Sequence, residues 1–421
     1  MTDSVAEQEF DVVIAGGGLV GASLAVALGA TGKSILVVEP AAVDSASQPS
    51  YDERTVALTY SSRNIFTAIG VWSQIELAGA EPIRDIHISN KGHFGQTHLS
   101  AQHAGTPALG YVVPTRVIGH CLWEKIEQSE TISTCCPATV ETLLPGDDHC
   151  RVVVNNGKTS TSLESKLVVL ADGGRSSLNQ QVGLHRESHG YDHSAILCIV
   201  SVDRPHRGRA YERFTDQGPL ALLPLGKPDQ ENGESMDRYA VVWTTGNEQL
   251  PARMELDDRG FISTLQLEFG DRAGNFSRPS ARKAYPLNKS SLDNPVMGRV
   301  VAIGNAAHTV HPVAGQGFNL GLRDVAWLAE IIHDCPPQDI GAAAMMNRYT
   351  SARRDDTRMV EYFTHSLIEI FANQHQPLSL ARNIGLKAIE YCPPAKRFLL
   401  KRTMGLASVG SRLALGLPLE I

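Results

Sequence analysis

Apolar runs alternate with stretches of helical length at the start of the chain. Phe10–Ala15 is a β-branched run that ends at glycines, Leu19–Ala30 has the length and composition of a helix, and Ser34–Glu39 is a second apolar run. A strand, a helix and a strand within about 30 residues form a βαβ unit, and such units build parallel sheets covered by helices. The pattern predicts that an α/β domain opens the chain.

Further apolar runs predict the rest of the sheet structure. Leu167–Ala171 and Val300–Ile303 also end at glycine-containing turns, so we expect the chain to return to the first sheet. Other stretches are strand-like and alternate apolar with polar positions, as expected for an antiparallel or mixed sheet in an inserted second domain. These stretches are His87–Leu99, Ile196–Val202, Gly218–Leu225 and Tyr239–Thr245.

The remaining chain is predicted to be helices and loops. Thr59–Gly70 has helical spacing, and the region from Phe318 onward is mostly helical, with breaks at Pro336-Pro337 and Pro393-Pro394. Two polar, turn-rich stretches are predicted loops: Ala41–Tyr51 and Lys227–Ser235.

These elements predict a fold of class α/β with three parts. A Rossmann-like nucleotide-binding domain is expected to be discontinuous, over residues 1–80, 104–182 and 283–345. A mixed or antiparallel sheet is expected to form an inserted substrate domain over 81–103 and 183–282. Residues 346–421 are expected to form a C-terminal helical region.

Composition narrows the class of protein. The chain has 421 residues, of which 42% are hydrophobic and 20% charged, which is typical of two or three folded units with a real core. The net charge is −7 and basic residues form no long run, so nucleic acid is not an expected partner. Seven scattered cysteines without zinc-site spacing favour reduced thiols and no metal site.

Targeting signals are also not apparent in the sequence. The first ten residues are acidic and polar, unlike a secretory signal. No apolar run approaches the roughly 18 to 20 residues that span a bilayer. We therefore expect a cytoplasmic enzyme with at most a peripheral contact with the inner membrane.

The first predicted βα turn carries a nucleotide-binding pattern. Gly16, Gly18 and Gly21 form G-x-G-x-x-G, in which the glycines permit a tight turn, close approach of a pyrophosphate and close helix packing. Glu39 ends the second strand, where a carboxylate can accept hydrogen bonds from ribose hydroxyls. These features alone do not distinguish FAD from NAD.

Two more glycine-rich turns follow strands of the same domain. The first reads A-D-G-G-R-S over Ala171–Ser176, and the second begins G-N-A-A-H at Gly304 and continues to Asp324. With these three motifs in this order, the sequence resembles the FAD-dependent aromatic hydroxylases of the p-hydroxybenzoate hydroxylase type. The resemblance implies that the first domain is an FAD-binding domain.

The resemblance also implies roles for residues of the later motifs. Asp172 and Gly173 would lie near the pyrophosphate and the nicotinamide donor, and Asn305 would meet the ribityl chain. Gly304, which begins the same motif, is also expected to bind the cofactor. The isoalloxazine ring would be lined by Gly315, Gln316, Gly317 and Asn319. Independently, a glycine-rich loop that feeds a helix presents N–H groups that stabilise an anionic reduced flavin.

A closer resemblance is to the ubiquinone-pathway subgroup of that family. Asp52–Leu58 matches D-x-R-x-x-A-L, and Ala314–Asp324 matches A-G-Q-G-x-N-L-G-x-R-D. By this resemblance Arg54 and Arg116 would contact the flavin. Asn179 and Pro114 depart from the family pattern, so contacts at those two positions are not carried over. Segments similar to the subgroup members that act on 2-polyprenyl-6-methoxyphenol are Pro82–Ser89, Gly92–Gly95, Glu212–Thr215, Gly218–Ala221 and Arg382–Leu386.

The resemblance implies a monooxygenase reaction. NAD(P)H would reduce FAD, the flavin would trap O₂ as a C4a-hydroperoxide, and a polyprenylated phenol would be hydroxylated to 2-polyprenyl-6-methoxy-1,4-benzoquinol. The prenyl tail would need an apolar channel, with the sheet of the second domain as its expected wall. His308 and His311 flank the flavin loop, but a structural role is more frequent for such histidines than a catalytic one, so no catalytic residue is assigned.

Alternatives stay open at this point. The ring could be hydroxylated at another position, the chain could be a different flavin oxidoreductase on the same fold, or it could bind FAD without turnover. Other ubiquinone-biosynthesis proteins are possible partners by the same resemblance. The segment Ala395–Leu419 mixes basic and apolar residues, which suits either an anionic lipid surface or a solvated capping helix.

Overall fold

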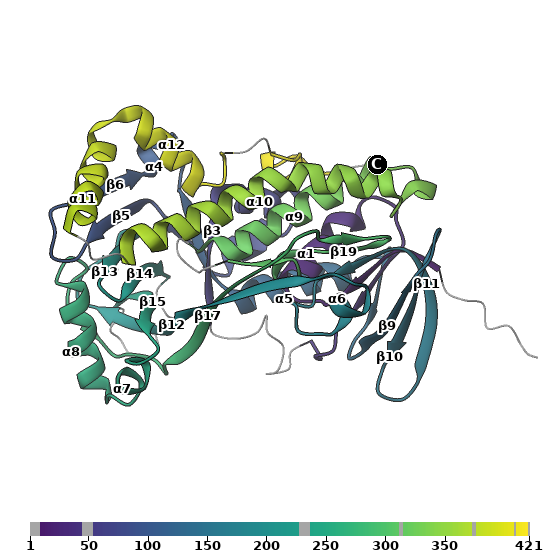
Figure 1. The fold of residues 1–421 in the computed structure, drawn as a ribbon, viewed down its shortest axis with the longest axis horizontal. Helices are drawn as coiled ribbons and strands as arrows, with labels where there is room; N and C mark the ends of the chain where they lie inside the picture. Colours follow the sequence, from purple (N-terminus) through teal and green to yellow (C-terminus); the bar gives the residue numbers. More distant parts are fainter. Residues whose placement is uncertain are drawn as a thin grey trace, which may run out of the picture.

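A computed structural model describes residues 9–43, 54–226, 236–310, 315–372, 376–407 and 410–419, with side chains omitted over 363–382. The predicted loop 227–235 and most of the predicted loop 41–51 lie outside these residues. Asp52, Glu53 and His311 lie outside them too. The described chain forms three sheets with helices packed on them (Figure 1).

Five parallel strands form the centre of the first sheet, in the order β19-β11-β1-β2-β8. Their bounds are β19 (Val300–Ala302), β11 (Ser160–Leu170), β1 (Glu9–Ala15), β2 (Ile35–Val38) and β8 (Ile132–Cys135). Antiparallel strands extend this sheet beyond β11 and β19: β10 (Cys150–Asn155), β9 (Thr139–Pro145) and β18 (Val296–Met297). The predicted βαβ unit and the return of the chain to this sheet are confirmed.

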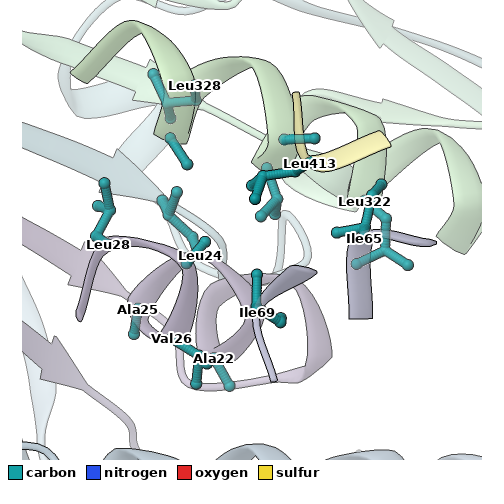
Figure 2. Packing of buried hydrophobic residues seen from close by; sticks show 14 of the residues in the cluster. Ala22, Leu24, Ala25, Val26, Leu28, Ile65, Ile69, Leu322, Leu328 and Leu413 are labelled. Atoms are coloured by element: carbon teal, nitrogen blue, oxygen red, sulfur yellow. The ribbon is translucent and has the colours of Figure 1, made fainter. Parts of the chain in front are cut away.

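Helices cover the first sheet on one face. They are α1 (Leu19–Gly29), α5 (Thr115–Glu127), α9 (Gln316–His333) and the start of α10 (Ala343–Ala372). In Figure 2, Leu24 and Leu28 of α1 lie toward Leu328 of α9, and Ile65 of α2 (Tyr60–Ala68) lies beside Leu322 of α9. The opposite face packs against the β9–β10 hairpin and the short α6 (Leu178–Gln181).

The second sheet has the order β20-β17-β12-β15-β14-β13-β5-β6, with β16 on β12, and its pairs are antiparallel except β13 with β5. The stretch expected as one strand-like region over His87–Leu99 is a hairpin of two strands, because a turn at residues 91–95 reverses the chain. The bounds are β20 (His308–Thr309), β17 (Lys283–Leu292), β12 (Arg186–Val202), β15 (Asp237–Gly246), β14 (Gly218–Leu225), β13 (Arg209–Thr215), β5 (Asp85–Asn90), β6 (Gln96–Ser100) and β16 (Phe276–Ser277).

One face of the second sheet packs on two helices, α7 (Leu250–Met254) and α8 (Asp258–Phe269). The other face looks toward α10, α11 (Gln376–Tyr391) and α12 (Pro393–Thr403), and α11 and α12 lie over β5 and β6 in Figure 1. Pro393 begins α12, as the predicted break implies.

A three-stranded sheet lies between the two larger ones. It consists of β3 (Thr55–Thr59), β7 (Gly110–Pro114) and β4 (Glu81–Ile83). Side chains of β4 and β7 pack against β13 and β14 in one apolar cluster. The domain boundaries stay a prediction. Strands β17 and β20 pair within the second sheet, although they fall in the range 283–345 expected for the first domain.

Candidate active site

The first glycine turn follows β1 and leads directly into α1. Gly16 has φ of 110°, and a Cβ there would lie 2.6 Å from the Ala171 carbonyl oxygen, while a Cβ at Gly21 would collide with the carbonyl oxygen of Gly16. Gly18 caps α1 without a side-chain hydrogen bond, and the first turn of α1 has no acidic residue. The first N–H groups of α1 are therefore available to an anionic group, as a pyrophosphate requires.

Glu39 follows β2 and is 5% exposed. Its carboxylate accepts hydrogen bonds from the Gly17 N–H at 2.6 Å and the Ala41 N–H at 2.9 Å. The Trp123 indole donates to the Gly17 carbonyl at 3.1 Å, so both sides of the turn are held. A carboxylate has about four acceptor positions, so Glu39 can still accept from ribose hydroxyls.

The second glycine turn follows β11 and is organised by Asp172. The carboxylate of Asp172 accepts from the Gly174 N–H at 2.8 Å, from the Ser176 N–H at 3.1 Å and from the Ser176 hydroxyl. Gly173 lies exposed at the tip of this turn. Asn179 is one of the two residues that depart from the family pattern. Its side-chain amide donates to the Ala306 carbonyl at 3.2 Å, which connects the second turn with the third.

The third turn follows β19 and is tied to a buried carboxylate. The N–H of Gly304 donates to Asp324 on α9 at 3.0 Å, and His308 and Arg353 each lie 2.7 Å from the same carboxylate. Burial alone would raise the pKa of Asp324, but the charges of His308 and Arg353 and the hydrogen bonds from His308 and Gly304 together lower it well below its usual value. This network holds the third turn, α9 and α10 together.

The same network assigns His308 a structural position. His308 is 6% exposed, is bonded to Asp324 and does not line the cavity described below. Arg353 was missed by the sequence analysis, although Arg353 and Asp356 stand three residues apart on α10 and form an ion pair. That spacing was the available signal.

The loop before α9 presents residues predicted to line a flavin. Gly315 caps α9 with φ of 60°. The Asn319 side chain accepts from the Thr59 N–H and the Ser62 hydroxyl, at 2.8 Å and 2.7 Å, and donates to the carbonyls of Ala57 and Gly315, at 2.8 Å and 2.6 Å. These four bonds use the full capacity of an amide, so Asn319 positions the loop and has no side-chain donor or acceptor left for a ligand.

The two predicted arginines have different surroundings. Arg54 precedes β3, and its guanidinium lies 5.6 Å from the ring centre of Tyr285. The backbone carbonyl of Arg54 accepts from the Thr115 N–H at 2.8 Å, which ties β3 to the start of α5. Arg116 is exposed on the first turn of α5.

A cavity of about 1240 Å³ lies between the start of α9, the second sheet and helices α10 to α12. All but two of the predicted site residues fall into two groups; the exceptions are Arg116, exposed on α5, and Asn319, within α9. One group stands at or near the carboxyl ends of the first sheet's parallel strands, and the other lines this cavity. The cavity-lining predicted residues are Arg54, Asn305, Gly315, Gln316 and Gly317.

The wall opposite the α9 loop is apolar, as the predicted channel requires. The sheet residues and helix residues that form this wall were not identified from sequence, because they come from separate strands and helices. They include Ile86, Ile88, Leu197, Ala210, Phe214, Ala221, Leu223, Val242, Leu386, Ile389, Phe398 and Leu399.

The described residues contain no cluster of three or more His, Cys, Asp or Glu side chains that could hold a metal ion. None of the helices in the described ranges is long and apolar enough to cross a membrane.

Known proteins similar to this chain have been identified. A family model described as FAD binding domain matches residues 9–364. Ubiquinone hydroxylase UbiL of Rhodospirillum rubrum is 33% identical over 98% of this chain and 94% of that protein. The 3-demethoxyubiquinol 3-hydroxylase of Escherichia coli is 30% identical over 95% of this chain and 99% of that protein.

Among solved structures, p-nitrophenol 4-monooxygenase PnpA from Pseudomonas putida has a TM-score of 0.77 at 18% identity, over 95% of this chain and 99% of that one. At this level of identity, the structural similarity shows a shared fold and nothing about the substrate. The predicted fold class, family and FAD cofactor are confirmed, and NAD(P)H is the typical co-substrate of this class. The chain belongs to the FAD-dependent aromatic hydroxylases, and it is a flavin-dependent monooxygenase.

Proposed function

We propose that this monooxygenase hydroxylates a polyprenylated phenol of ubiquinone biosynthesis, converting 2-polyprenyl-6-methoxyphenol to 2-polyprenyl-6-methoxy-1,4-benzoquinol. The observation that carries this proposal is the cavity of about 1240 Å³, which joins the α9 loop to a long apolar wall. That volume is above the usual range for small-ligand sites, and each buried methylene of a tail contributes about 0.8 kcal/mol. The names of the two curated relatives support the pathway.

In this proposal, the glycine turns and the α9 loop hold FAD. Bound FAD, once reduced by NAD(P)H, would activate O₂, so that one oxygen atom enters the phenol and the other leaves as water. The chain supplies N–H groups at the starts of α1 and α9, the Glu39 carboxylate for the ribose and a cavity that excludes water. The proposed cofactor-binding residues are Gly16, Gly18, Gly21, Glu39, Arg54, Arg116, Asp172, Gly173, Gly304, Asn305, Gly315, Gln316 and Gly317. Asn319 is proposed to hold the loop that binds the cofactor.

A second candidate is hydroxylation at another position of the ring. The E. coli relative, named as a 3-demethoxyubiquinol 3-hydroxylase, matches nearly the whole of this chain. Both reactions would use the same flavin and the same apolar wall. They differ in how the ring lies in the cavity.

The deciding experiment uses the FAD-loaded protein with NAD(P)H, ¹⁸O₂ and a short-tail 2-prenyl-6-methoxyphenol, with products read by mass spectrometry. One ¹⁸O atom para to the existing hydroxyl is the expected result. Label at another position would select the second candidate. Oxidation of NAD(P)H to H₂O₂ alone, with no labelled product from any phenol of the pathway, would contradict both.

The mouth of the cavity suggests how a prenyl tail enters. Phe398 lines the cavity and is 62% exposed, and Tyr391 nearby in the chain is 77% exposed. Arg397 and Lys401 are exposed one turn apart on α12. We propose that α12 contacts an anionic membrane surface peripherally, so that tails pass directly from lipid into the cavity.

Vesicle flotation tests this contact. The wild-type protein is expected to float with vesicles rich in phosphatidylglycerol, and a double variant Arg397→Glu, Lys401→Glu is expected to float several-fold less. A truncation before α12 is a poor test because Leu413 and Leu419 are buried in the main core. Equal flotation of both proteins, or none by the wild type, would remove the membrane contact.

A further inference from the structure

One row of side chains crosses the cavity face of the second sheet. Register places neighbouring residues of five strands side by side, and all five line the cavity. Since alternate residues of a strand share a face, their side chains stand together on the cavity side. The row is Ile88, Glu212, Ala221, Val242 and Leu197. Glu212 is its only charged member.

Arg213, the next residue on β13, has hydrogen-bond partners, whereas Glu212 has none among the described side chains. Arg213 lies on the opposite face, where its guanidinium donates to the Glu268 carbonyl and to the Ser89 hydroxyl, both at 3.4 Å. Among the residues whose side chains are described, none hydrogen-bonds or ion-pairs with Glu212. Glu212 is part-buried and lines the cavity. A polar group on an apolar wall is costly without a hydrogen-bond partner, so this carboxyl points to a polar group of the ligand.

Other ionisable groups line the same cavity from the surrounding elements: Arg54 before β3, Tyr211 on β13, Tyr285 on β17, Arg323 on α9, Asp355 and Asp356 on α10, and Arg402 on α12. None of these shifts the titration of Glu212. Burial raises the pKa of Glu212 to about 7. Glu212 therefore exchanges between a neutral and an ionised form near neutral pH.

We propose that Glu212 hydrogen-bonds to the phenolic hydroxyl of the ring substrate and so determines how the ring lies against β13. This inference rests on the proposed function, because it takes the ligand to be a phenol. The neutral carboxyl both donates and accepts, whereas the ionised carboxylate only accepts. A phenol can bond to either form, but the methyl ether of the same phenol has no proton to donate and can bond only to the neutral form.

The test compares two probes on the FAD-loaded protein: short-tail 2-prenyl-6-methoxyphenol and its O-methyl ether. Dissociation constants are measured from the change in flavin absorbance between pH 6 and pH 8.5. In the wild type, we expect the preference for the phenol to rise by about tenfold as the pH passes about 7, the effect of one lost hydrogen bond in a buried site.

Three variants separate this role from a structural one. Glu212→Gln keeps a hydrogen-bond donor and an acceptor at every pH. The preference of this variant for the phenol over the methyl ether is therefore expected not to change with pH. For Glu212→Leu, the ratio of the two dissociation constants is expected not to change with pH. The phenol and its methyl ether should then bind within about twofold of each other. The matched control Arg213→Met changes the opposite face and is expected to follow the wild type. If Glu212→Leu fails to retain FAD, Glu212→Gln decides.

A wild-type preference that does not change with pH, or a Glu212→Gln curve that follows the wild type, overturns the inference. Labelled product from ¹⁸O₂ is scored separately. Product with a flat preference contradicts the role of Glu212 alone. The expected preference without any hydroxylated product supports that role and contradicts the proposed function.

Discussion

At the scale of single residues, Asp324 shows how one carboxylate holds the site together. Asp324 is 1% exposed, and its carboxylate forms hydrogen bonds with the side chains of His308 and Arg353 and with the Gly304 N–H. Such a carboxylate stabilises the fold only while its partners remain, because an unpaired buried charge is strongly unfavourable. The three partners come from the turn after β19, from β20 and from α10.

Replacing Asp324 with Asn is expected to lower the free energy of unfolding by about 3 to 5 kcal/mol, because Arg353 and His308 lose the buried carboxylate that both contact and Arg353 keeps only its ion pair with Asp356. FAD retention should fall with it, since the Gly304 turn loses an anchor. Because folding lowers the pKa of Asp324 from its usual 3.8, its stabilisation is present above that pH and is lost as the pH falls below it. Denaturant unfolding at several pH values measures this.

The control for this substitution is Asp334→Asn, one residue beyond the end of α9. The Asp334 side chain is 39% exposed and pairs with Arg412, so its removal is expected to change stability by less than about 1 kcal/mol. An Asp324→Asn protein as stable as this control would show that the buried network is dispensable.

At the scale of elements, the close contact between the first glycine turn and α1 depends on Gly21. A Cβ at that position collides with backbone, which has no rotamer by which to move away. Gly21→Ala is therefore expected to displace α1 and to abolish retention of FAD through purification. Flavin absorbance per mole of folded protein gives the measurement.

The control for Gly21→Ala is the same substitution at the other end of α1, Gly29→Ala. Its Cβ would meet the flexible end of Ile132 at 3.2 Å, and Ala favours helices over Gly by up to about 1 kcal/mol. We expect this variant to retain FAD. Full FAD content in Gly21→Ala would mean that the turn tolerates a shift and that the close contact is not required.

At the scale of the whole molecule, the cavity exists because three helices from the end of the chain lie over a sheet built from its middle. Gly385 on α11 lines this cavity, and a Cβ there would meet no atom within 4 Å. Gly385→Phe should therefore place a ring in the space without displacing the backbone. It tests whether the α11 end holds the prenyl tail.

With this variant, kcat/KM for a substrate carrying several isoprene units is expected to fall by about tenfold or more, while a single-prenyl substrate stays within about twofold. The control Ile384→Phe changes a neighbour that is 54% exposed and should affect neither substrate. An equal loss for both tail lengths would place the tail elsewhere.

Local sequence patterns determined much of this protein. The βαβ unit, the three glycine turns and Glu39 could all be predicted, because each depends on residues near one another in the chain and on backbone geometry that few residue types permit. The resemblance to FAD-dependent hydroxylases rested on the same segments. The sequence did not predict where one antiparallel strand ends and the next begins, as the β5–β6 hairpin shows. The alternation of apolar and polar residues continues through a short turn and so does not mark it.

Tertiary structure alone decided which side chains share a surface. The sequence predicts Asn319 as a flavin contact, but three of its four side-chain hydrogen bonds go to Ala57, Thr59 and Ser62, about 260 residues earlier, and the fourth goes to Gly315. Glu212 stands in an apolar row only because strand register aligns five strands. A period of two predicts which residues share a face, but what covers that face depends on long-range packing, which no local pattern contains.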